Sequence, residues 1–207
     1  MKKIVSAKRV TTESTIAVEL DFSGLKPDYR KQIQTGITFL NHMIEHIAWR
    51  SGINIAVRQT LDEFQLTHVI CEDCAMTIGK AVADYVDSGK LEGVTGYGDG
   101  IGIIDEAYAS CAISFEGRAG LYFDSKIPIP DQTEGMLSED ILTFLEGFVQ
   151  GASCTLHIRV EQGKNGHHIW EAVYRGLGIA LGRALAVDAK RLGLTAGVAG
   201  KVDYQVN

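Results

Sequence analysis

The order of hydrophobic patterns in this chain occurs twice, and this recurrence constrains the fold more than any other feature. In the first half, residues 15–22 and 53–59 alternate apolar and polar side chains, as strands do. Residues 35–52 and 69–89 carry apolar side chains at helical spacing, and both segments end at a glycine. The first half therefore predicts the order strand, helix, strand, helix.

The second half follows a similar order after a glycine-rich stretch. Alternation predicts three strands, over 106–117, 121–127 and 154–163. Helical spacing predicts a helix over 137–153, with Ser138 as its N-cap, and a long helix over 167–188. We interpret the glycine-rich residues 96–102 as a hinge between the halves, because they precede a strand rather than a helix.

An internal duplication is the simplest explanation of this order. The elements lack a regular βαβ rhythm, so we expect an α+β fold in which each half is a sheet backed by two helices. The halves are expected at residues 1–93 and 94–207, within one compact domain. Each glycine inside the last helix costs about 1 kcal/mol relative to alanine. We expect these glycines to permit close helix packing: Gly176, Gly178 and Gly182.

The composition excludes several classes of partner. The 207 residues are 45% hydrophobic and carry a net charge of −6 without a basic cluster, which argues against nucleic acid. No signal peptide begins the sequence, and no apolar run approaches the length of about eighteen residues that a membrane span needs. Four cysteines are too few for a disulfide framework in a chain of this length. We therefore expect a cytoplasmic protein with reduced thiols.

A histidine–glutamate pair stands at the start of the last helix in each half. His68 precedes Glu72, and His167 precedes Glu171, by four residues, so each pair shares one helix face. An imidazole together with a carboxylate suits manganese, iron or zinc. His168 points about 100° away from His167 and can serve a different site. One such pair alone is more often a surface pair, but two at matching positions favour metal binding.

Three further groups are weaker candidates. His42 lies on an otherwise apolar helix, where it is either a ligand or a buried structural histidine. His46, one turn later, is expected to reach solvent. Cys71 and Cys74 form an H-x2-C-x2-C pattern with the preceding histidine, which can be a zinc arm, although a CxxC inside a helix is more often packing. The sequence contains no nucleophile elbow, P-loop or dinucleotide fingerprint.

Longer motifs resemble those of the imidazoleglycerol-phosphate dehydratase family over nearly the full length. The family's opening R-x-T-x-E is matched by Arg9, Thr11 and Glu13, and its S-G-R-P by "EGRA" with Arg118. Three further motifs are matched by "TGITFLNHMI", "HVICED" and "GIIDEAY". The final motif is matched by "CTLHIRVEQGKNGHHIWEAVYRG".

The resemblance implies a fold, a reaction and a set of site residues. The fold is a duplicated α+β half of the ribosomal protein S5 domain 2-like type. The reaction is the dehydration of an imidazole polyol phosphate in histidine biosynthesis by a lyase that assembles as a trimer or 24-mer. Neighbouring subunits hold manganese through residues that match His42, His68, Glu72, His167, His168 and Glu171. The implied catalytic residues are Glu13, His42 and Glu171, and the implied substrate-binding residues are Arg9, Arg118, Arg175 and Lys201.

The chain departs from the family pattern at several positions. Val69 and Thr143 stand where histidines are expected, and Gly96 replaces a phosphate-binding arginine. A further histidine is replaced by Arg50. We therefore expect one manganese ion, or two if both sites are complete. Three interpretations remain: a divergent dehydratase, an enzyme of this fold that uses one metal on another small substrate, and a non-catalytic relative kept for assembly or binding.

Overall fold

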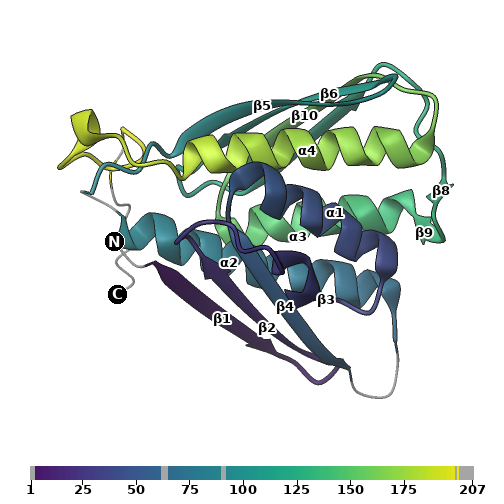
Figure 1. Cartoon of the computed structure of the whole chain (residues 1–207), viewed down its shortest axis with the longest axis horizontal. Coiled ribbons are helices and arrows are strands. Elements are labelled where there is room, and N and C mark those ends of the chain that lie inside the picture. Colours follow the sequence, from purple (N-terminus) through teal and green to yellow (C-terminus); the bar gives the residue numbers. More distant parts are fainter. Residues whose placement is uncertain (1–2, 62–64, 90–91, 199, 201–207) are drawn as a thin grey trace, which may run out of the picture.

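The computed structural model describes residues 3–61, 65–89, 92–198 and 200. Two four-stranded sheets lie on the outside, and the four helices lie between them (Figure 1). The first half contains β1 (Ile4–Val10), β2 (Ser14–Asp21), β3 (Ile33–Gln34), α1 (Thr38–Ser51), β4 (Asn54–Leu61) and α2 (Thr67–Ser88). The second half contains β5 (Tyr97–Ile104), β6 (Ala107–Ser114), β7 (Gly120–Ser125), α3 (Ser138–Ala152), β10 (Thr155–Gln162) and α4 (Gly166–Ala184).

The two sheets have the same topology. Their strand orders are β1-β2-β4-β3 and β5-β6-β10-β7. In both sheets the first three strands pair antiparallel and the edge strand, β3 or β7, pairs parallel. The predicted α+β class and the duplication of a sheet backed by helices are therefore confirmed. A short hairpin, β8 (Gln132–Thr133) and β9 (Met136–Leu137), precedes α3 and has no counterpart among the described residues of the first half.

The halves join through their helices. α1 packs against α4, and α2 packs against α3, so each contact pairs one helix from each half. In α4, Gly178 and Gly182 face α1, where added Cβ atoms would crowd Arg50 and Ser51, while Gly176 faces β5 and β6. The expectation that these glycines permit close packing is confirmed.

The interpretation of residues 96–102 as a hinge is wrong, because Tyr97–Ile104 forms strand β5. Gly98, Gly100 and Gly102 alternate along this strand and face α4, where an added Cβ would overlap backbone carbonyl oxygens. The strand has the usual alternation, but three of the four residues on its inner face are glycines, so α4 lies directly on the sheet. Composition alone made this strand resemble a loop.

Other boundaries also differ from the prediction. Ser138 is not an N-cap: Leu137 occupies that position, and the Ser138 hydroxyl donates to the carbonyl of Pro130 and accepts from Trp170 Nε1 at 3.3 Å. α1 begins at Thr38, three residues later than predicted, and α4 ends at Ala184, four residues earlier. The prediction missed β1, β3 and the β8–β9 hairpin.

The cysteines belong to the core. All four are buried and none forms a disulfide: Cys71, Cys74, Cys111 and Cys154. Burial raises the pKa of Cys74 to about 12 and that of Cys71 still further, so neither is a ready thiolate ligand. This favours the packing interpretation over a zinc arm. Among the described residues, no helix is both long and apolar enough to span a bilayer.

Candidate metal centre

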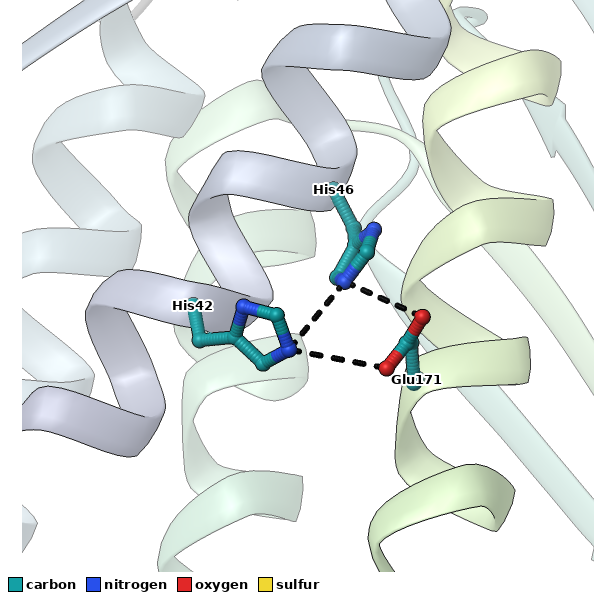
Figure 2. A group of neighbouring side chains, drawn as sticks. All are labelled: His42, His46 and Glu171. Carbon is teal, nitrogen blue, oxygen red and sulfur yellow. Dashed lines mark hydrogen bonds and ion pairs between the residues drawn. The ribbon is translucent and has the colours of Figure 1, made fainter. Parts of the chain in front are cut away.

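Three polar side chains converge between α1 and α4. His42 and His46 lie one turn apart on the same face of α1, and Glu171 faces them from the first half of α4 (Figure 2). Helical spacing places the two imidazoles together, and the close α1–α4 contact brings in the carboxylate. Among the described residues, these three form a group whose donor atoms all lie within 4.8 Å of one another.

The donor atoms themselves face a common point. The Nε2 atoms of His42 and His46 are 3.3 Å apart. His46 Nε2 lies 3.2 Å from Glu171 Oε1, and His42 Nε2 lies 3.5 Å from Glu171 Oε2. His167, one turn before Glu171 on α4, also directs Nε2 at Oε2, at 3.3 Å. Imidazole nitrogens with one carboxylate are a ligand set that suits a divalent manganese, iron or zinc ion.

Carboxylates contact the Nδ1 atoms of two of these imidazoles, on the side of the ring away from Glu171. Glu45 Oε2 lies 3.4 Å from His42 Nδ1, and Glu45 in turn pairs with Arg30. Glu134 Oε1 lies 3.0 Å from His167 Nδ1. A carboxylate on Nδ1 fixes the ring and leaves Nε2 for a metal, which is the usual arrangement behind metal-binding histidines. The carboxylate contacts at Nδ1 therefore orient the same Nε2 atoms that face Glu171.

The Glu134 carboxylate comes from an unusual turn. Glu134 has φ +50° and Gly135 has φ +82°, so both central residues of the β8–β9 turn are left-handed. Two-residue hairpin turns of this kind need positive φ at both positions, which a glutamate adopts only at some cost. At the start of α4, Asn165 caps the helix by accepting from the His167 backbone N–H at 2.8 Å. The turn and the cap together place the His167 side chain.

The charges of the cluster suit a cation. Burial lowers the pKa of His46 to about 4, although the charge of Glu171 opposes this shift. Burial by itself raises the pKa of Glu171, but the charges of His46, Arg175 and His42 outweigh burial, and the net pKa is lowered. At neutral pH the cluster therefore presents a neutral His46 imidazole and a carboxylate, the protonation states that metal binding requires.

Arg175 occupies the other side of Glu171. Its guanidinium forms an ion pair with Glu171 from one turn further along α4, and its Nη1 donates to the carbonyl of Ile103 at 2.8 Å. The family resemblance implied that Arg175 binds the substrate. The structure places it against the carboxylate of the cluster, where it offsets the charge of a buried acid.

The remaining predicted ligands lie elsewhere in the subunit. His168 turns away from the cluster, and its Nδ1 contacts Glu106 Oε2 at 2.8 Å. His68 opens α2 with a side chain that is 62% exposed, 3.7 Å from Asp140 of α3. Glu72 follows it one turn later and is half-buried. Three of the six predicted ligands therefore meet at α1–α4, namely His42, His167 and Glu171. The other three point in other directions.

The other predicted substrate and catalytic residues are equally dispersed. Arg9 of β1 pairs with buried Asp73 of α2 at 2.6 Å. Arg118 pairs with Glu116 on the surface after β6. Glu13 is exposed in the turn between β1 and β2. Lys201 lies outside the described residues.

His46 is the residue that sequence reasoning undervalued. It was expected to reach solvent, but its side chain is only 13% exposed and faces Glu171. The signal was present in the sequence, because His42 and His46 have the same four-residue spacing as the two histidine–glutamate pairs. What the sequence lacked was the partner helix that covers this face of α1.

Comparisons with known proteins show the family of this chain. The sequence profile of the family described as imidazoleglycerol-phosphate dehydratase matches residues 35–181, which include α1, α2, α3 and most of α4. The chain belongs to the imidazoleglycerol-phosphate dehydratase family.

Individual relatives of this family match almost end to end. The imidazoleglycerol-phosphate dehydratase of Ralstonia nicotianae is 34% identical over 194 residues, 93% of this chain and 95% of the relative. That of Burkholderia vietnamiensis is 35% identical over 192 residues, 92% of this chain and 95% of the relative.

Solved structures of the family also superpose on this chain. The dehydratase from Staphylococcus aureus gives a TM-score of 0.75 at 25% identity, covering 89% of this chain and 99% of the other. The Pyrococcus furiosus dehydratase in complex with (S)-C348 gives a TM-score of 0.75 at 29% identity, covering 94% and 99%. The family fold therefore extends over both halves.

Proposed function

We propose that this protein is a metal-dependent lyase that removes water from imidazoleglycerol phosphate, a step in histidine biosynthesis, in the cytoplasm. Family membership over nearly the whole chain supports the reaction. The single observation that carries the metal dependence is the convergence of imidazole and carboxylate donors between α1 and α4. A structural polar cluster would not need two imidazoles backed by carboxylates on their far nitrogens.

In this proposal a manganese ion is held by His42, His167 and Glu171. When bound, the ion acts as a Lewis acid toward the imidazole ring of the substrate. Glu45 and Glu134 keep the two imidazoles oriented, and burial of Glu171 keeps its carboxylate in place. Arg175 balances the charge of Glu171, which is otherwise costly to bury.

The other predicted catalytic and substrate-binding residues would act in an assembled particle. Glu13 is a proton-transfer group on an exposed turn, and Arg9 and Arg118 are cations for the substrate phosphate. His68, Glu72 and His168 lack a common point within one subunit, so a second and weaker metal site would form only between subunits. We therefore propose a homo-oligomer, either a trimer or a 24-mer.

A second candidate function is favoured by the substitutions. Val69 and Thr143 lie on α2 and α3, away from the α1–α4 cluster. Gly96, in place of the phosphate-binding arginine, has φ +73° and an added Cβ there would overlap Ala196, so this position is built for a turn. An enzyme with one metal acting on a small substrate other than imidazoleglycerol phosphate fits these features.

The test is a turnover assay on purified protein with imidazoleglycerol phosphate, combined with manganese analysis per subunit. The proposal predicts dehydration that is lost on chelation and restored by manganese, and that falls at least about 100-fold in an E13Q variant. Bound manganese without dehydration of this substrate would favour the second candidate. Dehydration that persists after complete chelation would contradict the metal dependence.

A further inference from the structure

We propose that His46 is a metal ligand, so that His42, His46 and Glu171 form a metal site complete within one subunit. This inference rests on the metal dependence of the proposed function and not on its substrate. The family motif quoted above ends before position 46, so the assignment comes from the geometry of this chain. The donor set is two imidazole nitrogens and one carboxylate, which suits manganese, iron or zinc.

The separations of the donor atoms carry the argument. Ligands bound at about 2.1 Å and separated by roughly 90–109° around one ion have donor atoms about 3.0–3.4 Å apart. The two imidazole nitrogens are 3.3 Å apart, and their distances to the carboxylate oxygens are 3.2 and 3.5 Å. Two of these separations fall within the range expected for ligands of a single ion, and the third exceeds it by about 0.1 Å. Helix spacing and a single helix–helix contact provide this geometry without any other chain.

The orientation of the rings is a second, independent observation. The Nε2 atoms of His42 and His46 face one another, with rings nearly perpendicular and centroids 4.5 Å apart. If these two nitrogens shared a hydrogen bond, one of them would carry the proton and only the other would offer a lone pair. A metal ion instead accepts a lone pair from each nitrogen. His42 keeps Glu45 behind its other nitrogen. The His46 side chain is only 13% exposed and that of Glu171 only 5%, so these two donors are largely shielded from water.

The consequence is a difference between the two sets of predicted ligands. His68, Glu72 and His168 need residues of another subunit to complete a site. His42, His46 and Glu171 need none, and His167 can add a fourth donor from the same chain. A single subunit therefore binds one metal ion before any assembly.

The test is a manganese titration, followed by the paramagnetic resonance signal of free Mn²⁺, on the wild type and on an H46Q variant. The expected result is at least about a tenfold weaker Kd for H46Q. The matched control is H157Q, because His157 stacks on Tyr122 on the outer face of β10, and its Kd should stay within about twofold. Wild-type affinity in H46Q, with an unchanged circular dichroism spectrum, would overturn the assignment.

A second variant keeps the assignment testable if H46Q folds poorly. An H46C variant loaded with Cd²⁺ should show a sulfur-to-cadmium charge-transfer absorption, because thiolate is a good ligand for soft cations. An H157C variant should show none at one equivalent of Cd²⁺. Absence of the band in folded H46C would overturn the assignment.

Turnover of imidazoleglycerol phosphate is measured separately on the same samples. Loss of manganese in H46Q alongside a wild type that does not dehydrate this substrate would support the inference and contradict the proposed function. Wild-type manganese affinity in H46Q, together with a wild type that dehydrates this substrate, would contradict the inference and support the proposed function. The two proposals therefore fail in different experiments.

Discussion

The α1–α4 pair and the α2–α3 pair occupy equivalent places in a duplicated fold but differ in chemistry. At α1–α4, His42, His46 and Glu171 converge on one point. At α2–α3, an exposed His68 faces Asp140, and Val69 and Thr143 stand where the family pattern has histidines. The comparison shows that a duplicated scaffold can pack closely in both copies while polar side chains converge at only one of its two helix pairs.

Both helix pairs pack closely through glycines. In α2–α3, Gly79 and Gly151 bring the helix backbones together, and an added Cβ at either would overlap a carbonyl of the facing helix. In α1–α4, Gly178 of α4 allows the close approach, because an added Cβ there would lie 2.8 Å from Arg50 Cβ and 3.0 Å from the carbonyl oxygen of His46. Close packing therefore explains the glycines in both pairs, and the polar residues distinguish the pairs chemically.

The largest expected effect is on stability and should appear in both pairs. G178A places a Cβ 2.8 Å from Arg50 Cβ and 3.0 Å from the carbonyl oxygen of His46 in α1, and G79A places one 2.4 Å from the carbonyl oxygen of Phe148 in α3. Because backbone cannot yield as a side chain can, each should lower the free energy of unfolding by about 3 kcal/mol in urea titrations. The control I103A, on the exposed face of β5, should cost well under about 1 kcal/mol. If the free energy of unfolding fell by about 3 kcal/mol in only one of the two variants, the two pairs would not depend on close packing to the same degree.

The next effect should separate the pairs. E171Q removes the carboxylate charge that faces His42, His46 and His167, so manganese affinity should fall at least about 100-fold. E72Q, the matching change on α2, should leave the tightly bound ion in place. Equilibrium dialysis with manganese analysis of both variants checks this, and equal losses would mean that the two pairs are chemically equivalent.

The titration of His46 predicts a pH effect in metal-free protein. Burial lowers the pKa of His46 from 6.5 to about 4, so the unfolded state takes up a proton at a pH where the folded state does not. Stability is therefore full above about pH 6.5 and should fall by on the order of 2 kcal/mol as the pH drops to about 4. Urea titrations in the presence of a chelator should show a shallower fall for H46Q. An identical pH dependence in H46Q would show that His46 is not the group responsible.

The smallest effect concerns the residues behind the ligands. E134Q weakens the contact of residue 134 with His167 Nδ1 and leaves the histidines of α1 unchanged. The Kd for manganese should therefore rise by about tenfold. The fold should be unchanged, because Glu134 is 56% exposed. The matching change E45Q, behind His42, should have a similar effect. An unchanged Kd in both variants would mean that the carboxylates do not orient the ligands.

Much of this architecture follows from local patterns in the sequence. Helical spacing and alternation predicted the four helices and most of the long strands, and the recurrence of the histidine–glutamate pairs predicted the duplication. The prediction missed β5 because glycines occupy three of the four inner positions of this strand, which leaves almost no apolar alternation to detect: Gly98, Gly100 and Gly102. Periodicity also identifies helix faces but not their partners. The pairing of His46 with Glu171, 125 positions later in the chain, therefore could not be predicted.

The central claim is that the α1–α4 pair holds a metal ion by itself and the α2–α3 pair does not. Manganese per subunit, measured on wild type and on a V69H/T143H double variant after removal of loosely bound ions, tests it most directly. The account predicts about one ion in the wild type, and a rise toward about two when both histidines are restored to α2 and α3. About two tightly bound ions in the wild type, or one that survives in E171Q, would contradict it.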